Sequence, residues 1–304
     1  MPEGAAGTHE VEQERLAAFL GERKRLLRLA YRYLGSVSEA EDAVQDAWLR
    51  FVAADEAGHA GRYLSRIVTN LCLDRLKAAQ ARRERYVGPW LPEPLVEAAS
   101  AFDTDTNDAA LDISFGVMRA LERLSPLERA SLFLHDLYDL SFEEVAETLK
   151  RSPAACRQMA SRARRSLKEG SARFQPSEAD VARFVASFAE TARTGDIGPL
   201  KRLLAEDVDF VSDGGGKATA ALNVVSGADK VARFLLGLAR KRTSGMAVSV
   251  LTAAINGGPG LIVHVDGRLD HTMAFSVDRA GVIAAIYVVR NPDKLRAVPQ
   301  AGGT

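Results

Sequence analysis

The sequence predicts a multidomain protein with two all-α modules followed by an α+β domain. Three observations predict it. The chain has 304 residues, more than one ordinary compact core accommodates. Apolar residues recur at helical spacing through the first half, and runs typical of strands appear only after Pro176. A stretch rich in proline and acidic residues separates the two helical parts.

The composition is that of a folded protein rather than a disordered one. Hydrophobic residues make up 47% of the chain and charged residues 26%, close to the averages for globular domains. No apolar run is long enough to cross a bilayer and the first residues are acidic and polar, so we expect a cytoplasmic protein without membrane contact. Cys72 and Cys156 lie far apart with no C-x-x-C or histidine partner, and we expect structural thiols, no metal site and no cofactor.

The first module, residues 1–88, is predicted to be a small helical bundle. Helical spacing of apolar residues runs from residue 14 to about residue 86. Ser38 and Glu41 have the S-x-x-E spacing of a capping box, which predicts that a helix begins there. The last helix ends in a basic run, which a solvated helix end explains as well as a nucleic-acid contact does.

Residues 89–110 are predicted to form a linker. Three prolines between positions 89 and 94 exclude a helix interior, and from Glu93 to Asp112 there are six acidic residues and no basic residue. Trp90 and Leu91 stand between these prolines. Apolar side chains of this size on a semi-rigid spacer are more often docked than left in water, so we expect them to contact another surface.

The second module, residues 111–175, is predicted to contain a helix-turn-helix. A short helix, a three-residue turn and a longer basic helix follow one another, which is the order this motif requires. Between Lys150 and Arg173 there are eight basic residues and one acidic residue. Three N-cap signals mark the helix starts: Ser125 with Glu128, Ser141 with Glu144, and Ser152 before Pro153.

The last helix of this module has two faces with different chemistry. Arginine side chains can bind guanine, glutamine can bind adenine, and further basic groups can neutralise phosphate. The alternative is a solvated basic helix without a DNA contact. The packing face is predicted to hold Cys156, Ala160, Ala163 and Leu167. The reading face is predicted to hold Ala154, Arg157, Gln158, Ser161, Arg162 and Arg165.

The third domain, residues 176–296, is predicted to be α+β, with residues 297–304 as a flexible tail. An amphipathic helix after Pro176 and a helix over 228–240 should cover one face of a curved antiparallel sheet. The expected strands are 208–212, 246–255, 261–266, 271–278 and 282–290.

Two patterns in this domain invite a catalytic interpretation. His264, Asp266, His271 and Tyr287 could supply acid and base groups to a pocket, although a histidine on a sheet is more often structural. The segment from Asp213 to Lys217 lacks the spacing of a phosphate-binding loop and is interpreted as a flexible hairpin turn. We therefore expect no catalytic residues.

Three segments of the first 170 residues resemble regions two and four of the extracytoplasmic-function (ECF) sigma factors. They are SEAEDAVQDAWLRF, GRYLSRIVTNLCLDRLK and LSPLERASLFLHDLYDLSFEEVAETLKRSPAACRQMASRARRSLK. In that family the first helix binds core RNA polymerase, the second melts and reads the minus-ten promoter element, and the helix-turn-helix reads the minus-thirty-five element. The acidic linker resembles the family segment that runs toward the RNA exit channel.

The resemblance implies roles for individual residues. The implied polymerase contacts are Asp42, Gln45, Asp46, Trp48, Leu49 and Arg50, although Trp48 serves equally well as core. The implied minus-ten contacts are Arg66, Asn70, Asp74, Arg75, Lys77, Arg82 and Arg83. The implied minus-thirty-five contacts are Ser152, Arg157, Gln158, Ser161, Arg162 and Arg165.

The C-terminal domain is similar to the SnoaL-like, cone-shaped α+β domains, and one group of ECF sigma factors carries such an extension. Members of that group share the motifs WLPEP, DGGGK and NPDKL, which stand here in the same order. The regulatory contacts that they imply are Trp90, Pro92, Glu93, Pro94, Asp213, Gly214, Gly215, Gly216, Lys217, Asn291, Pro292, Asp293, Lys294 and Leu295.

The expected function is therefore that of a sigma factor controlled in cis by its C-terminal domain. The expected partners are core RNA polymerase and promoter DNA, with a small ligand in the SnoaL-like pocket left open and a monomeric state when free. The alternatives are a DNA-targeted enzyme, a ligand-responsive transcription regulator that works without polymerase, and a passive C-terminal appendage.

Overall fold

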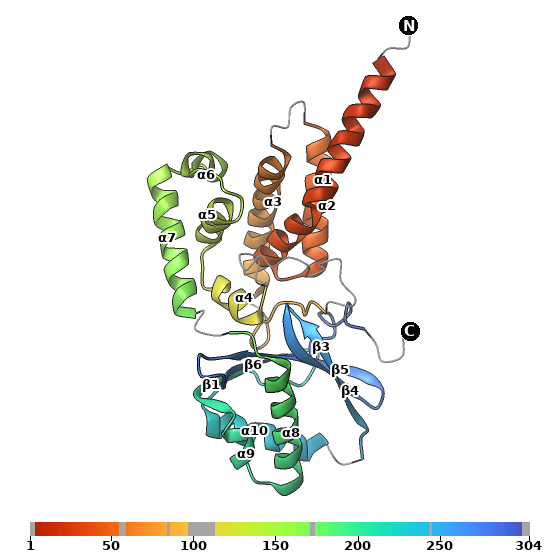
Figure 1. Ribbon diagram of the computed structural model, residues 1–304, viewed down its shortest axis with the longest axis vertical. Coiled ribbons are helices and arrows are strands. Elements are labelled where there is room, and N and C mark those ends of the chain that lie inside the picture. Colours follow the sequence, from red (N-terminus) through yellow and green to blue (C-terminus); the bar gives the residue numbers. More distant parts are fainter. Residues whose placement is uncertain are drawn as a thin grey trace. The chain divides into compact units, whose positions relative to one another are not determined.

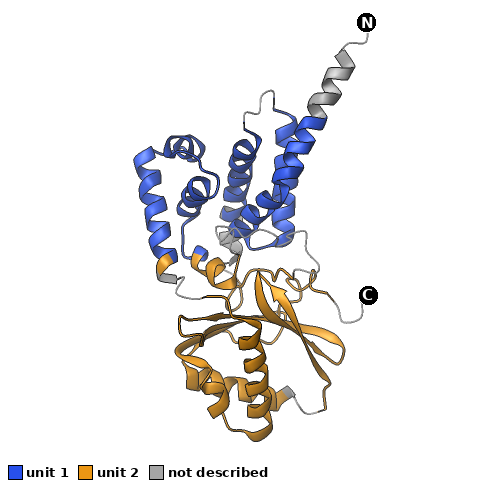
Figure 2. Ribbon diagram, in the orientation of Figure 1, with its two compact units in different colours: residues 1–82, 101–112, 121–167 blue, residues 83–100, 113–120, 168–304 orange. Residues whose placement is uncertain are grey.

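The chain forms two compact units, which Figure 2 shows in different colours. The computed structural model describes residues 4–54, 59–83, 86–96, 113–170, 174–242 and 245–299. The first unit comprises residues 1–82, 101–112 and 121–167, and the second comprises 83–100, 113–120 and 168–304. The segment with the WLPEP motif thus belongs to the same unit as the C-terminal domain.

The N-terminal part of the first unit consists of three helices, α1 (Gly4–Leu34), α2 (Val37–Val52) and α3 (Ala60–Arg83) (Figure 1). The N-cap of α2 is Ser36, whose hydroxyl accepts a hydrogen bond from the Glu39 amide at 3.3 Å. The predicted start at Ser38 is therefore wrong by two residues. The S-x-x-E spacing occurs twice here, and Gly35, at φ +67°, ends α1 so that Ser36 is the first extended residue.

The rest of the first unit contains the predicted helix-turn-helix. Helices α5 (Pro126–Asp136), α6 (Phe142–Leu149) and α7 (Pro153–Gly170) follow the short helix α4 (Phe115–Glu122), which both units share. Capping boxes at Ser125 and Ser141 are both formed, as predicted. Lys150 adopts a left-handed conformation, φ +53°, and so ends α6 before α7 begins.

The second unit is built on a six-stranded sheet with the order β2-β1-β6-β5-β4-β3. Its strands are β1 (Leu204–Asp213), β2 (Val225–Ser226), β3 (Val248–Ile255), β4 (Gly258–Val265), β5 (Arg268–Val277) and β6 (Ile283–Val289). The helices are α8 (Glu178–Thr194), α9 (Gly198–Lys201) and α10 (Ala228–Arg242). All neighbouring strands are antiparallel except β1 and β6, which are parallel, so the sheet is mixed.

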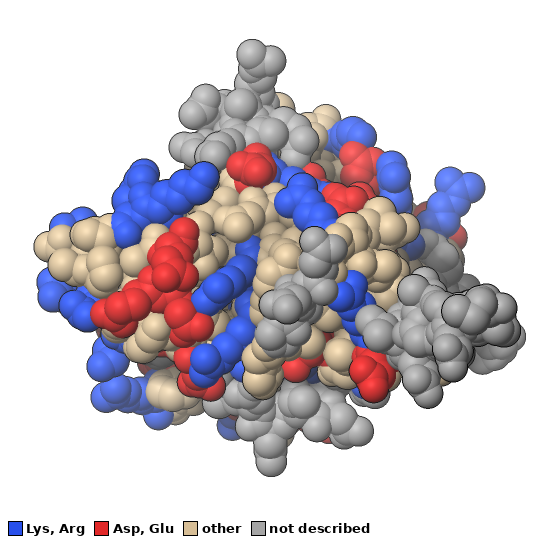
Figure 3. All heavy atoms as spheres, turned by 90° about the horizontal axis from the view of Figure 1, so that it is seen from above, with Lys and Arg blue, Asp and Glu red and all other residues tan. Residues whose placement is uncertain are grey.

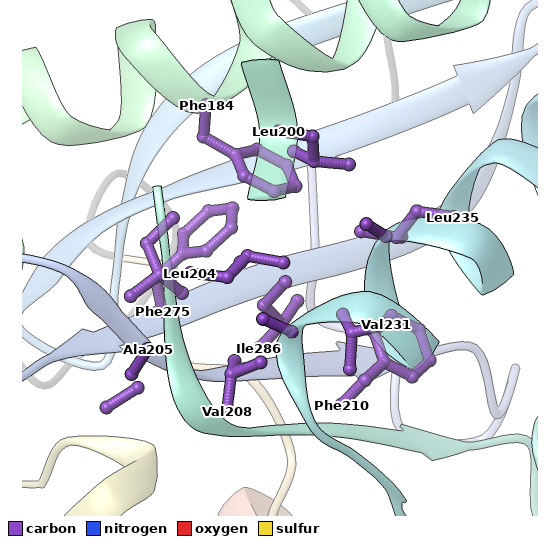
Figure 4. Close-up of a cluster of buried hydrophobic side chains, with 14 of the residues drawn as sticks. Phe184, Leu200, Leu204, Ala205, Val208, Phe210, Val231, Leu235, Phe275 and Ile286 are labelled. Atoms are coloured by element: carbon purple, nitrogen blue, oxygen red, sulfur yellow. The ribbon is translucent and has the colours of Figure 1, made fainter. Parts of the chain in front are cut away.

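The sheet has an apolar core on each face. On the helix-covered face, Phe184 and Leu235 pack against strand residues such as Phe210 and Ile286 (Figure 4). The second core alternates with the first along the strands, as the period of two requires. It consists of Leu91, Val96, Phe115, Val211, Ile255, Ile262, Ala274, Ala285, Tyr287, Val289, Leu295 and Val298. Residues from the linker, from α4 and from the C-terminal end therefore cover the face that the helices leave open.

Within the described residues, no helix combines the length and the apolarity that a bilayer crossing would need.

Candidate functional site

The two faces of α7 are separated as the sequence predicts. Of the predicted packing face, Cys156, Ala160 and Ala163 are fully buried and Leu167 is half-buried. The exposed residues of this helix and its cap include all of the implied minus-thirty-five contacts: Ser152, Arg157, Gln158, Ser161, Arg162 and Arg165. Ser152 also caps the helix, because its hydroxyl accepts from the Ala155 amide at 3.2 Å. The arrangement presents a row of donors to solvent on a helix that packs through its other face.

Some basic side chains of the first unit form ion pairs with acidic side chains. Arg157 pairs with Glu143 at 2.9 Å, with both side chains more than half exposed, and such a pair contributes little to stability. The face shown in Figure 3 carries Lys and Arg side chains in groups beside groups of Asp and Glu.

The implied polymerase contacts lie on α2. Asp42, Gln45 and Arg50 are exposed, and Leu49 is an apolar side chain with 61% of its surface exposed. Trp48 is half-buried, with its ring 4.9 Å from that of Phe19. The structure thus gives Trp48 a packing role, while Leu49 is the apolar side chain of this set that is free to contact a partner surface.

The implied minus-ten contacts on α3 are in different environments. Asn70 and Asp74 are exposed. Arg75 pairs with Asp46 at 2.7 Å and donates to the Glu39 carbonyl at 2.6 Å, which ties α3 to α2. The side chains of Lys77, Arg82 and Arg83 lie outside the described residues.

Arg66 of α3 is paired with Glu144 of α6 at 2.9 Å. Arg62 lies 3.8 Å from the same carboxylate and donates to the Asp139 carbonyl at 3.2 Å. Hydrogen bonds from Ser141, the helix cap, and the charges of both arginines lower the pKa of Glu144. An open cleft beside this pair is lined by Arg62, His135, Asp136, Asp139, Leu140, Ser141 and Glu144. Arg66 is therefore held by the helix-turn-helix in this arrangement.

A buried arginine that sequence reasoning missed also lies in the first unit. Arg129 of α5 is 4% exposed and donates to the carbonyl of Tyr33 and to that of Leu121, each at 2.7 Å. It satisfies carbonyl groups near the ends of α1 and α4, which have no partner within their own helices. Nothing in the spacing of α5 distinguishes this arginine from exposed ones, so no sequence signal pointed to it.

Asp213 is the centre of a group of residues that binds the linker, here called the linker site, which also contains Tyr86, Leu91 and Lys294. Its carboxylate is fully buried and accepts from the Tyr86 hydroxyl at 2.6 Å, from the Leu91 amide at 2.8 Å and from the Lys294 ammonium at 2.8 Å. Burial, followed by the hydrogen bond to Asp213, raises the pKa of Tyr86, so the phenol remains a donor. Residues of two segments that are distant from Asp213 in the sequence, 86–91 and 291–295, thus converge on its carboxylate.

Lys294 completes this site from the NPDKL motif. Only 9% of its side chain is exposed, and it also donates to the Leu91 carbonyl. Its ammonium lies 4.0 Å from the centre of the Trp90 ring and 5.0 Å from that of Tyr86, within cation–π distance. Trp90 is therefore docked, as expected, and Pro92 and Pro94 are buried beside it while Glu93 is half-buried.

Close contacts at Gly214 and Gly215 and positive φ angles at Gly215 and Gly216 favour glycine at all three positions of the DGGGK segment. A side chain at Gly214 would meet the Ala218 carbonyl at 2.2 Å, and one at Gly215 would meet the Asn291 amide at 2.2 Å. Gly215 and Gly216 also have positive φ, +56° and +71°. The segment is a turn, but it is packed against the linker rather than free. Lys217 pairs with Asp293 at its exposed side.

The NPDKL segment follows β6 and shapes the same site. Asn291 donates to the Tyr86 hydroxyl at 2.8 Å, and its backbone amide donates to the Asp213 carbonyl at 3.0 Å. Its own side-chain oxygen accepts from the Asp293 amide. The Pro292 carbonyl accepts from the amide of Leu295, whose side chain is in the second core.

The four residues considered for catalysis do not converge. Tyr287 is buried under Phe115, with ring centres 5.6 Å apart. It lies opposite Ala274, which lies opposite Gly260, so His264 is displaced by four residues, or about 13 Å along the strand. Asp266 is exposed in a hairpin turn, and His271 is bonded to Asp270 at 2.6 Å. Among the described residues, no cluster of metal-ligating side chains is present.

Comparisons with known proteins agree over most of the chain. Residues 19–82 match the family model of Sigma-70 region 2, and residues 115–167 match that of Sigma-70, region 4. The ECF RNA polymerase sigma factor SigJ of Mycobacterium tuberculosis is 40% identical over 291 residues, which is 91% of this chain and 92% of SigJ. A probable ECF sigma factor of the same species, SigI, is 32% identical over 92% of this chain and 96% of its own length.

The same similarity is found in three dimensions. The crystal structure of M. tuberculosis SigJ superposes with a TM-score of 0.72 and 36% sequence identity. It covers 94% of this chain and 99% of that chain. The similarity therefore extends beyond the helical modules into the C-terminal domain with its mixed sheet.

Proposed function

We propose that this chain, which belongs to the family of ECF RNA polymerase sigma factors, has its promoter engagement controlled in cis by its C-terminal domain. As a member of that family it directs promoter-specific initiation of transcription, and sigma factors bind core RNA polymerase and promoter DNA. The further proposal concerns how the second unit acts on that function, and which residues make the contacts.

The observation that carries the proposal is the capture of the linker by Asp213. The linker joins the module that matches region 2 to the module that matches region 4. Tyr86 and Leu91 of this connection are bound to a buried carboxylate of the sheet domain. The sheet domain therefore holds the chain at the point where the separation of the two DNA-reading modules is determined.

Chain length shows why this capture matters. The minus-ten and minus-thirty-five elements are about 25 base pairs apart, or roughly 85 Å of duplex. The 28 residues from Tyr86 to Ile113 are joined by 27 residue-to-residue steps and could span about 90 Å if fully extended and free. A linker held on the sheet loses most of that reach, so the placement of both modules depends on whether it is docked.

Within this function we assign the exposed residues of α7 to the minus-thirty-five element and those of α3 to the minus-ten element. The exposed positions on α2, with Leu49 as the apolar contact, are assigned to the polymerase. The proposal includes no catalytic role and needs no small ligand. We further propose that the free protein is monomeric and acts in the cytoplasm, where its polymerase is.

The test is promoter-specific transcription in vitro with reconstituted core polymerase and the full-length chain. Asp213→Asn keeps an acceptor but removes the charge that pairs with Lys294, and should change transcript yield at least threefold. Asp207→Asn, at an exposed position of the same strand, is the control and should leave the yield unchanged. Equal yields from both variants would show that the linker contact does not control promoter use.

A further inference from the structure

Asn256 holds both ends of the segment that the linker contributes between Leu95 and Ile113. Its backbone amide donates to the Leu95 carbonyl at 2.8 Å, and its side-chain oxygen accepts from the Leu95 amide at 2.9 Å. Its side-chain nitrogen donates to the Ile113 carbonyl at 2.9 Å. The residue is 1% exposed, and its partners are 161 and 143 positions away.

A simpler explanation is that Asn256 is an asparagine only because the turn between β3 and β4 requires one. Asn256 and Gly257 form the two-residue connection between β3 and β4, with φ of +53° and +79°, and Asn-Gly is the preferred sequence for such a turn. That requirement does not explain why the side chain is buried. It also does not explain two side-chain hydrogen bonds to distant backbone groups.

The next hairpin of the same sheet provides an internal comparison. Asp266 and Gly267 join β4 to β5 with φ of +50° and +75°, so the turn is of the same kind. The Asp266 amide donates to the Ala247 carbonyl at 2.8 Å, and its side-chain oxygen accepts from the Ala247 amide at 2.9 Å. Ala247 directly precedes β3, so this pair lengthens the sheet by one residue.

Asn256 makes the same two bonds, but to Leu95 of the linker. Val96 forms an antiparallel bridge with Ile255, so this part of the linker pairs with β3 as a short additional strand would. The third bond, to Ile113, requires a side-chain donor, which asparagine has and aspartate lacks when ionised. The comparison therefore explains why this turn carries asparagine where the next carries aspartate.

We propose that Asn256 is a positioning residue that clasps the linker at both ends, so that the sheet, and not the length of residues 97–112, sets where the two sigma modules leave the C-terminal domain. Both ends meet at one side chain, so the segment between them adds nothing to the distance between its attachment points. This inference rests on the proposed control in cis, and it adds a second, separate point of attachment to that of Asp213.

The experiment is hydrogen exchange of the full-length chain, read by mass spectrometry on peptides covering residues 91–96 and 113–118. Asn256→Gly keeps the positive φ of the turn and removes both side-chain bonds. We expect exchange in both peptides to accelerate at least tenfold. The matched control is Asp266→Gly, which makes the same change in the turn between β4 and β5. It should leave both peptides as protected from exchange as they are in the unaltered chain.

Asn256→Asp separates the two side-chain contacts. It retains an acceptor for the Leu95 amide and loses the donor to Ile113, so exchange should accelerate at residues 113–118 and less at 91–96. If Asn256→Gly does not fold, this variant carries the comparison. Unaltered protection of residues 113–118 in Asn256→Asp would overturn the two-ended clasp.

Transcription with the same variants distinguishes the clasp from the proposed control. Faster exchange in Asn256→Gly with unchanged transcript yield would leave the clasp standing and refute control through the linker. Unchanged exchange in Asn256→Gly, together with an altered yield for Asp213→Asn, would overturn the clasp and leave the proposed control intact.

Discussion

Replacing Asp213 with alanine should strongly destabilise the second unit. The carboxylate is fully buried, and its partner Lys294 has only 9% of its side chain exposed, so solvent screens the pair weakly. Removing one member of a buried ion pair costs about 3–5 kcal/mol, because the remaining charge stays buried without its counter-charge. The Leu91 amide and the Tyr86 hydroxyl lose the same acceptor.

The corresponding thermal shift follows from the size of the unit. For domains of 150–250 residues, 1 kcal/mol corresponds to about 2–4 °C in Tm. Asp213→Ala should therefore lower the Tm of the second unit by roughly 6–20 °C, measured by differential scanning calorimetry on the full chain. Asp207→Ala, on the exposed part of the same strand, should shift the Tm by less than about 2 °C.

A double-mutant cycle tests whether the pair itself is responsible. Combining Asp213→Asn with Lys294→Met removes both charges, and two neutral groups of similar size cost less than one unpaired charge. The double variant should thus be more stable than the sum of the single effects predicts. Additive effects, or a Tm for Asp213→Ala close to that of Asp207→Ala, would refute the reasoning that Asp213 and Lys294 hold the linker by a buried charge pair.

Three further predictions concern the first unit. Arg162→Ala should reduce the slope of log affinity against log salt concentration, for binding of the holoenzyme to minus-thirty-five DNA, by about one ion. Arg164→Ala should leave this slope unchanged, because the Arg164 side chain is hydrogen-bonded to Asp136. Equal slopes for the two variants would show that Arg162 does not contact the DNA. Arg129→Met should lower the free energy of unfolding in urea by about 1–3 kcal/mol, because the carbonyls of Tyr33 and Leu121 each lose the donor that Arg129 provides. A loss no larger than that for exposed Arg123→Met would contradict this. The pKa of Glu144 is lowered in the folded chain, so its carboxylate stabilises the fold at pH values above the ordinary pKa of 4.5, and this contribution is lost as the pH falls through the lowered pKa. Glu144→Gln should therefore make the urea midpoint depend less on pH between pH 6 and pH 3. An unchanged pH dependence would argue against this role.

Local sequence signals predicted what depends on neighbouring residues. The capping boxes at Ser125 and Ser141 and the two faces of α7 follow from spacing within one or two helical turns, and the structure has all of them. The start of α2 was misplaced because the same spacing begins at Ser36 and again at Ser38, and only the end of the preceding helix decides between them.

Contacts between distant segments could not be predicted from spacing. The parallel pairing of β1 with β6 joins strands about 70 residues apart, which strand periodicity does not encode. Arg129 and Asn256 were missed for a related reason. Each is compatible with an ordinary local role, on a helix surface or in a hairpin turn, and its long-range partners are visible only in the folded chain.

Apolar and polar contacts have different roles in binding the linker. Leu91, Val96 and Phe115 are at most 4% exposed, and burying side chains of this size contributes about 1.5–3 kcal/mol each. Such burial is non-directional, so it holds the linker on the sheet without determining its register. Asp213 and Asn256 determine the register, because each binds one particular backbone amide, that of Leu91 and that of Leu95. A partner that releases the linker must therefore replace the apolar cover of the sheet as well as the contacts of Asp213, because the apolar burial and the buried ion pair each contribute several kcal/mol.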